Sequence, residues 1–188
     1  MATKLVAFAG SSRANSFNQK LVRAAADVAR ARGAEVEVID LRALELPIFD
    51  QDLEAADGPP EGARRFKEAL KAADGFLISS PEYNSSYPAL LKNAIDWASR
   101  PAEGEPMLAA FAGKACGLLA ASPGALGGLW MLPILRLLLS NIGVHVVPTQ
   151  FGLGKAHEAF DDEGRLVDER ARATVERVVD ETLEIAGR

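Results

Sequence analysis

The sequence is poor in cysteine and histidine. Its single cysteine, Cys116, excludes a disulfide or a cysteine-based metal site within one chain. Cys116 stands in the apolar run ACGLLAA, and this setting predicts a buried, unreactive thiol. His145 falls in a predicted strand and His157 in a predicted loop, so the sequence indicates neither a metal site nor a catalytic histidine.

Basic charge is also in short supply. Lys and Arg total 21 against 26 Asp and Glu, which gives a net charge of −5, and the basic residues are scattered along the chain. A protein that binds nucleic acid or an anionic membrane usually gathers basic residues on one surface. We therefore expect neither nucleic acid nor a membrane as the main partner.

The sequence has no apolar run long enough to cross a membrane. The most apolar stretch, 128–143, falls short of the ~20 residues that a bilayer requires, and it contains Pro133 and Arg136. It predicts a core or interface helix instead.

The N-terminal sequence MATKLVAFAGSSR turns polar too early for a signal peptide, so we expect a cytoplasmic location. With 188 residues, 48% of them hydrophobic, the chain 1–188 is expected to form a single domain.

Apolar segments of strand length alternate with longer segments of helical spacing. The predicted strands are residues 4–10, 35–41, 75–80, 115–121 and 144–148. Each is an almost continuous apolar run, as in a parallel sheet that is covered on both faces. We therefore predict a flavodoxin-like, doubly wound α/β fold, with a five-stranded parallel sheet in the order 2-1-3-4-5 and helices on both faces.

The segments between the strands predict helices. The buried face of the first helix is expected at the apolar residues that recur at helical spacing, Phe17, Leu21, Ala24 and Val28. Pro88 fits the first turn of a later helix, in which Lys92 and Asp96 are placed to pair. A last amphipathic helix is expected over 168–187, and residues 54–62 are interpreted as a surface connection.

In such a fold the ligand binds beyond the carboxyl ends of the strands, where strand order reverses. The first turn there, GSSRANSFN at 10–18, opens directly into a helix, whose N-terminus favours an anion. Ser11, Ser16 and Asn18 can donate neutral hydrogen bonds. Arg13 can add a charge-assisted one, so the turn predicts a phosphate site. The alternative is that Ser16 or Asn15 only caps the helix.

Common nucleotide-binding motifs do not fit this turn. A P-loop needs GxxxxGK[ST], and Gly10 is followed by neither the second glycine nor the lysine. The dinucleotide fingerprint GxGxxG is absent there. The later GLGKAH at 152–157 has His157 in place of the third glycine and follows the fifth predicted strand, so we interpret it as a loop. The strand ends also lack the acidic residues of a phospho-acceptor domain.

Two further turns complete the predicted pocket. Pro81 and Pro88 bracket a stiff turn whose N–H groups, aromatic ring and amide suit a flat heterocycle. Glu82 is a candidate general acid or base there, and the alternative is a structural acceptor or a solvent-facing charge. In SPGALGGL at 122–129, glycines let the backbone approach a ligand closely, although a plain flexible turn is the alternative.

The combination of GSSRANSFN, PEYNSSYPALLKNAIDWASRP and SPGALGG resembles the NADPH-dependent FMN reductase family, which includes chromate, quinone and azo-dye reductases. The resemblance runs through nearly the whole chain and implies a non-covalently bound FMN. It implies that the FMN phosphate is held by Ser11, Arg13, Ser16, Phe17 and Asn18. It implies that the flavin ring is lined by Pro81, Glu82, Tyr83 and Asn84. At the other edge of the ring it implies Ser122, Gly124, Gly127 and Gly128.

The resemblance further implies an NAD(P)H oxidoreductase. NADPH or NADH would deliver hydride to flavin N5 and leave before a small acceptor binds, in a ping-pong cycle that needs no catalytic residue of the protein. The acceptor would be a quinone, an azo dye, chromate or free flavin. Alternatives are a flavodoxin-like electron carrier, which the acidic charge also suits, and a flavin-free binding protein. The apolar helix after Gly128 and the resemblance both predict a homodimer or homotetramer.

Overall fold

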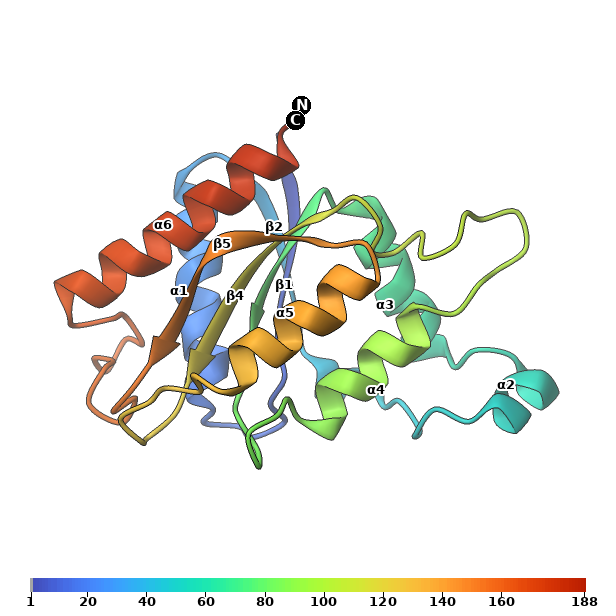
Figure 1. Cartoon of the computed structure of the whole chain (residues 1–188), viewed down its shortest axis with the longest axis horizontal. Helices are drawn as coiled ribbons and strands as arrows, with labels where there is room; N and C mark the ends of the chain where they lie inside the picture. Colours follow the sequence, from blue (N-terminus) through green and yellow to red (C-terminus); the bar gives the residue numbers. More distant parts are fainter. Residues whose placement is uncertain (1) are drawn as a thin grey trace.

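A parallel sheet forms the centre of the computed structural model, which describes residues 2–188 (Figure 1). Five strands lie in the order β2-β1-β3-β4-β5, and every neighbouring pair is parallel. The strands are β1 (Lys4–Ala9), β2 (Glu35–Ile39), β3 (Gly75–Ser79), β4 (Ala115–Ala121) and β5 (His145–Leu153). The predicted flavodoxin-like topology is therefore confirmed.

Helices cover both faces of this sheet (Figure 1). On one face lie α1 (Phe17–Ala31) and α6 (Glu169–Ala186). On the other face lie α3 (Glu61–Ala72), α4 (Ala89–Ala98) and α5 (Met131–Asn141). A short 3-10 helix, η1 (Leu41–Leu44), follows β2, and α2 (Gln51–Asp57) projects at the side of the molecule without a buried residue.

Side chains of the central strands alternate between two cores. In β1, Val6 and Phe8 point to the core under α3, α4 and α5, whereas Leu5 and Ala7 point to the core under α1 and α6. Burial on both faces explains why these strands are continuous apolar runs. Cys116 in β4 is fully buried, and burial raises the pKa of its thiol, so the predicted buried thiol is confirmed.

The fifth strand is longer than predicted. β5 continues to Leu153, so the prediction of a strand over 144–148 was too short, and the first two residues of the predicted loop 152–157 are strand. Its pairing with β4 shifts register at a bulge that contains Pro148. The Arg136 guanidinium donates a hydrogen bond to the Pro148 carbonyl at 3.3 Å and also bonds the two preceding carbonyls. The sequence prediction ended at the proline because proline interrupts a ladder, whereas Arg136 supplies partners to this irregular segment.

The buried face of α1 differs from the predicted one. The residues that it buries are Asn18, Leu21, Val22, Ala25, Ala26 and Ala29. Of the predicted stripe only Leu21 is buried, while Phe17, Ala24 and Val28 are half-buried. Alanines face the sheet because small side chains let the helix pack closely. In the sequence, a stripe of alanines marks a buried helix face less clearly than a stripe of larger apolar residues does.

The other helix predictions agree with the structure. In α4 the Lys92 ammonium lies 2.6 Å from the Asp96 carboxylate, as expected for residues one turn apart. Asp168 caps the N-terminus of α6 by accepting the backbone N–H of Ala171 at 2.7 Å. The segment 54–62 lies at the surface, but it begins within α2 and ends within α3.

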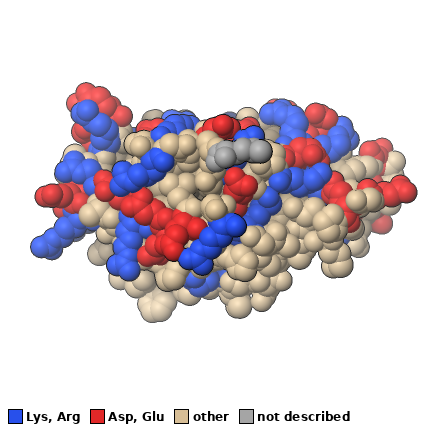
Figure 2. Space-filling model, turned by 90° about the horizontal axis from the view of Figure 1, so that it is seen from above, with Lys and Arg blue, Asp and Glu red and all other residues tan. Residues whose placement is uncertain are grey.

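Charges of both signs are mixed on the face that carries the chain ends. Lys and Arg side chains alternate there with Asp and Glu, so no extended patch of one sign forms on that face (Figure 2). None of the helices within residues 2–188 combines the length and the apolar character that a membrane span requires.

Candidate functional site

Three loops meet at one edge of the sheet, the lower edge in Figure 1. Loop A (residues 10–16) follows β1, loop B (80–88) follows β3 and loop C (122–130) follows β4. Because the strands are parallel, their carboxyl ends share this edge, and the strand order reverses there between β1 and β3. All predicted site residues lie in these loops or in the first turn of α1.

Loop A surrounds the N-terminus of α1 with polar hydrogens. Ser16 is the N-cap, and its hydroxyl oxygen accepts the backbone N–H groups of Asn18 at 3.2 Å and Gln19 at 3.4 Å. Backbone N–H groups that donate to no other residue within 2–188 are those of Ser11, Ser12, Ala14, Asn15 and Phe17. These unbonded donors and the helix dipole make the loop suitable for an anion.

Arg13 adds a positive charge to loop A. Its guanidinium donates a hydrogen bond to the Asn15 carbonyl at 3.1 Å and lies 5.1 Å from the centroid of the Phe17 ring. These two contacts hold the side chain over the start of α1. Because a guanidinium has five N–H donors, Arg13 keeps donors for a charge-assisted bond to an anion.

The side-chain amide of Asn18 connects α1 to the ends of two strands. Its oxygen accepts the backbone N–H of Ala121 and the hydroxyl of Ser79, each at 2.9 Å. Its nitrogen donates to the Ala121 carbonyl, also at 2.9 Å. Asn18 and Ser79 are buried, so these bonds replace water that neither group can reach. Asn18 therefore fixes the position of loop A relative to β3 and β4.

Loop B carries a tight turn at its tip. Tyr83 and Ser86 exchange two backbone hydrogen bonds, of 2.9 and 3.0 Å. The two residues between them have positive φ angles, 52° at Asn84 and 62° at Ser85, which is the pattern of a type I′ turn. Asparagine tolerates this conformation, whereas serine adopts it at a cost. The turn projects the half-exposed Tyr83 ring and leaves the N–H groups of its two central residues unbonded within residues 2–188.

Glu82 joins loop B to the start of α5. Its carboxylate oxygen accepts the backbone N–H of Met131 at 2.9 Å, so the negative charge lies at a helix N-terminus, where the dipole stabilises it. Of the roles considered for Glu82, the structural acceptor is the one that this contact supports. Pro88 ends loop B as the residue before the first turn of α4.

Loop C is shaped by its glycines. Gly127 and Gly128 have φ angles of 63° and 89°, which other residues rarely adopt. A Cβ on Gly127 would lie 2.5 Å from the carbonyl carbon of Gly152, and one on Gly128 would lie 2.7 Å from the Cβ of Ala120. This packing holds the loop, so it is not a plain flexible turn. Within residues 2–188, the backbone N–H groups of residues 124–128 find no acceptor.

The structure thus gathers the predicted residues at one edge but gives them different surroundings. Asn18 and Glu82 are engaged by other parts of the protein, whereas Arg13, Tyr83 and Asn84 are exposed. Sequence reasoning missed the buried pair of hydroxyls at Ser79 and Ser80 and the acceptor role of Ala121. The two serines that end an otherwise apolar strand were the only signal of this network.

The site offers hydrogen-bond donors rather than a reactive group. Loop A supplies the Arg13 guanidinium and backbone N–H donors. Loops B and C supply further backbone N–H groups at the carboxyl ends of β3 and β4. In the part of the chain that the structure describes, no group of His, Cys, Asp and Glu side chains is arranged to hold a metal ion. The arrangement is therefore suited to binding a molecule with an anionic end and a polar flat part.

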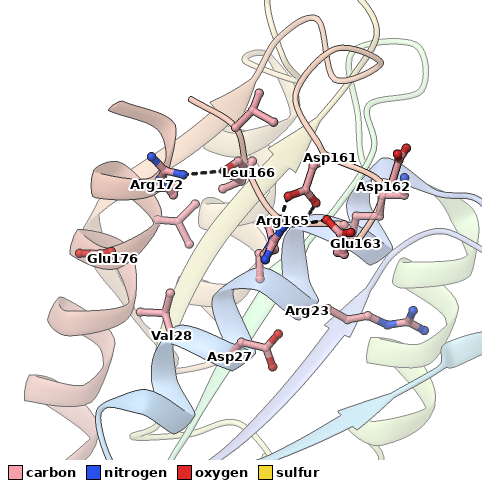
Figure 3. A pocket seen from close by; sticks show the side chains of 15 residues that line it. Arg23, Asp27, Val28, Asp161, Asp162, Glu163, Arg165, Leu166, Arg172 and Glu176 are labelled. Carbon is pink, nitrogen blue, oxygen red and sulfur yellow. Dashed lines mark hydrogen bonds and ion pairs between the residues drawn. The ribbon is translucent and has the colours of Figure 1, made fainter. Parts of the chain in front are cut away.

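A cavity away from these loops lies between α1, α6 and the loop 161–167 (Figure 3). It measures about 900 Å³. Arg165 reaches into it from the loop, and its guanidinium lies 2.8 Å from Asp161 and 2.7 Å from Glu163. Asp27, on the α1 side of the groove, pairs with Arg30 at 2.8 Å. Because these charges neutralise one another, the groove offers less to a charged ligand than its polar lining suggests.

Comparisons with known proteins show relatives along the whole chain. The family model described as NADPH-dependent FMN reductase matches residues 3–158. An NAD(P)H-dependent FMN reductase of Pseudomonas aeruginosa is 36% identical over 175 residues, which cover 93% of this chain and 90% of that protein. A quinone reductase of Pseudomonas putida is 35% identical over 173 residues, with 91% and 88% covered.

Among solved structures, a flavoenzyme NAD(P)H:(acceptor) oxidoreductase from Paracoccus denitrificans is similar, with a TM-score of 0.84 and 30% sequence identity. The match covers 99% of this chain and 98% of that one. A flavodoxin from the domain Archaea has a TM-score of 0.65 at 11% identity, with 99% and 100% covered, and this likeness concerns the fold alone.

The Asn18 network leads to a prediction about stability. Asn18→Ala leaves the Ala121 N–H and carbonyl and the Ser79 hydroxyl buried without partners. We expect the free energy of unfolding to fall by about 2–5 kcal/mol, as measured by urea denaturation. Asn15→Ala is the matched control, because its side chain is exposed in the same loop, and should change stability by less than about 0.5 kcal/mol. Equal stability of the two variants would show that the network is dispensable.

Proposed function

The chain belongs to the NADPH-dependent FMN reductase family, and we propose that it passes reducing equivalents from NADPH or NADH through bound FMN to small quinone-type acceptors. The observation that carries this proposal is the set of unbonded donors on loops A, B and C at the switch point of the sheet. The family fixes the reaction type as an NAD(P)H-dependent flavin oxidoreductase. The proposal assigns that reaction to these loops.

The donors of loop A fit the phosphate of FMN. Hydroxyl, amide N–H and guanidinium groups are those that bind phosphate, and α1 directs its N-terminus at the same place. Ser11 is a buried residue of this loop, and its hydroxyl accepts the Arg13 N–H at 3.4 Å. We assign Ser11, Arg13, Ser16 and Phe17 to the phosphate end. Asn18 contributes to this end by holding the loop against the ends of β3 and β4.

The donors of loops B and C fit the flavin ring. The ring is flat, and its edge carries several acceptors that backbone N–H groups can satisfy. Pro81 is buried and stiffens the entry to loop B, while Tyr83 and Asn84 form the exposed turn. Loop C offers Gly124, Gly127 and Gly128 with Ser122 at its start. We propose that these two loops hold opposite edges of the ring, with Glu82 keeping them together through its bond to α5.

Bound FMN supplies the redox chemistry, since it can take a hydride and later release reducing equivalents. The protein's residues then need only to bind, orient and expose one face of the ring, which agrees with the lack of a paired acid and base in the loops. Because no second nucleotide fingerprint occurs in the sequence, we propose that the nicotinamide nucleotide and the acceptor use the same open face in turn. This order predicts ping-pong kinetics.

The names of the relatives support quinones as the first acceptors to test. Relatives include quinone reductases of Pseudomonas putida, and a 2-hydroxy-1,4-benzoquinone reductase of Burkholderia that is 35% identical over 182 residues. Azo dyes, chromate and free flavin remain candidates on the resemblance of the loops. The alternative of a non-enzymatic electron carrier is not favoured, because the archaeal flavodoxin shares the fold at only 11% identity.

We also propose that two copies of the chain associate through α5, as a homodimer or as part of a homotetramer. Leu126, Trp130, Ile134 and Leu137 follow at helical spacing along one side of α5 and the turn before it. They are 57%, 58%, 40% and 62% exposed, and so they form a stripe that water covers in the single chain. Large exposed apolar stripes mark interaction surfaces.

We also propose a cytoplasmic location, which the use of NADPH or NADH as reductant supports.

The reaction is tested by anaerobic reduction. We expect the purified protein to bind FMN, and NADPH or NADH to bleach the flavin absorbance, with the colour returning when a quinone is added. The initial rates should give parallel double-reciprocal plots for the two substrates. If neither nucleotide reduces the bound flavin, the reductase function is wrong and the electron-carrier alternative becomes the better one. A protein that takes up no FMN would contradict both.

Arg13 gives a test of the phosphate end. Arg13→Ala removes a charged hydrogen-bond donor, and we expect FMN binding to weaken by roughly 1.5 to 3 kcal/mol in a fluorescence titration. Because the side chain is exposed, the urea denaturation midpoint should change little. An unchanged FMN affinity would remove Arg13 from the site.

The assembly is tested by gel filtration at micromolar concentration, where we expect the wild-type chain to elute as a dimer or tetramer. Leu137→Asp places a charge at the C-terminal end of the exposed α5 stripe, on its most exposed residue, and should shift the elution to a smaller species. Met107→Asp is the matched control, since Met107 is 82% exposed but lies outside α5. A wild-type monomer, or an equal effect of both variants, would contradict the α5 interface.

A further inference from the structure

Arg42 lies beside loop A, although it comes from a different part of the chain. It stands in η1, directly after β2, and β2 pairs with β1 at the edge where loop A begins. The Asp40 carboxylate caps η1 by accepting the Arg42 backbone N–H at 2.9 Å. The Arg42 guanidinium donates a hydrogen bond to the carbonyl of Ser12 at 3.4 Å. The backbone of η1 is thus fixed, and the side chain extends toward loop A.

The charge of Arg42 is not used within the chain. Its side chain is exposed and makes no ion pair with any residue between 2 and 188. The single bond to Ser12 is long, so it contributes little by itself. Most of the guanidinium donors therefore remain available. This contrasts with Arg100, whose guanidinium is held by the Glu54 carboxylate at 2.8 Å.

Arg42 and Arg13 approach loop A at different points. Arg13 is bonded to the Asn15 carbonyl and lies over the Phe17 ring, at the end of the loop that enters α1. Arg42 is bonded to the Ser12 carbonyl, at the end of the loop that leaves β1. Unbonded backbone N–H groups in the stretch between these two contacts are those of Ser12, Ala14 and Asn15. A small anion bound to those groups would have a guanidinium near each end of the loop.

We propose that Arg42 is a second cation for the phosphate group bound by loop A, and that it makes the site selective for phosphorylated flavin over riboflavin. The proposal rests on the proposed function, because it takes FMN as the ligand of the loop. A phosphate monoester carries a charge of about −1.5 to −2 at neutral pH, which one guanidinium neutralises only in part. A second guanidinium, at the end of loop A that leaves β1, completes the neutralisation of the phosphate charge. Riboflavin has no phosphate and gains nothing from it.

The experiment compares FMN and riboflavin binding by quenching of flavin fluorescence in Arg42→Ala, Arg42→Lys and wild-type protein. We expect Arg42→Ala to weaken FMN binding about three- to tenfold, in the range of a partly exposed charged contact, and to leave riboflavin binding unchanged. Arg42→Lys should recover part of the FMN affinity because it keeps the charge. Added salt should reduce the difference between wild type and Arg42→Ala.

Arg23→Ala is the matched control. Arg23 is an exposed arginine in α1 that makes no ion pair with a residue of the range 2–188, so the variant changes net charge by the same amount away from loop A. Its FMN affinity should equal that of wild type. If Arg23→Ala weakens FMN binding as much as Arg42→Ala does, the effect is one of net charge and the assignment of Arg42 is wrong.

Other outcomes also overturn the assignment of Arg42 without touching the proposed function. Equal losses of FMN and riboflavin affinity in Arg42→Ala would mean that the residue only shapes the loop. Unchanged FMN affinity with a raised KM for NADPH, and not for NADH, would mean that Arg42 reads the 2′-phosphate of the nucleotide instead. Failure of the wild-type protein to bind FMN would instead refute the proposed function itself.

Discussion

The side-chain amide of Asn18 is the contact on which the geometry of the site depends. It bonds the backbone N–H and carbonyl of Ala121 at the end of β4 and the hydroxyl of Ser79 at the end of β3. All three partners are buried, so none can exchange this bond for one to water without opening the core. Because Asn18 is in the first turn of α1, the same contact sets where the helix N-terminus points relative to the other two loops.

The polar groups of the loops divide into those that hold the loops and those that remain available. Glu82 binds the start of α5, and the glycines of loop C pack against the ends of β4 and β5, so these features give the loops their shape. Backbone N–H groups and the exposed Arg13 are left for a ligand. This division explains how a site can be rich in hydrogen bonding and poor in reactive side chains. A bound flavin requires precise placement more than an acid or a base from the protein.

Much of the fold could be predicted because its determinants are local. Five apolar runs separated by helical segments indicate a parallel sheet covered on both faces, and the structure has that sheet in the predicted order. The errors occur where a distant residue changes the outcome. β5 passes Pro148 because Arg136 bonds the carbonyls of the bulge, and α1 turns its alanines to the sheet because packing there favours small side chains. Neither effect is visible in a local pattern.

The sequence by itself determined which turns form the candidate site, because the positions of the loops follow from the strand order and the hydroxyl, amide and glycine residues of these loops stand out from the apolar strands. Tertiary structure alone decided what each side chain does. Asn18 is bonded to two strand ends, and Glu82 accepts a backbone N–H at the start of α5. Arg42 gave no signal in the sequence although it lies beside loop A. The physical reason is that a hydrogen bond depends on the position of its partner. In this fold the partners come from strands and helices far apart in the chain.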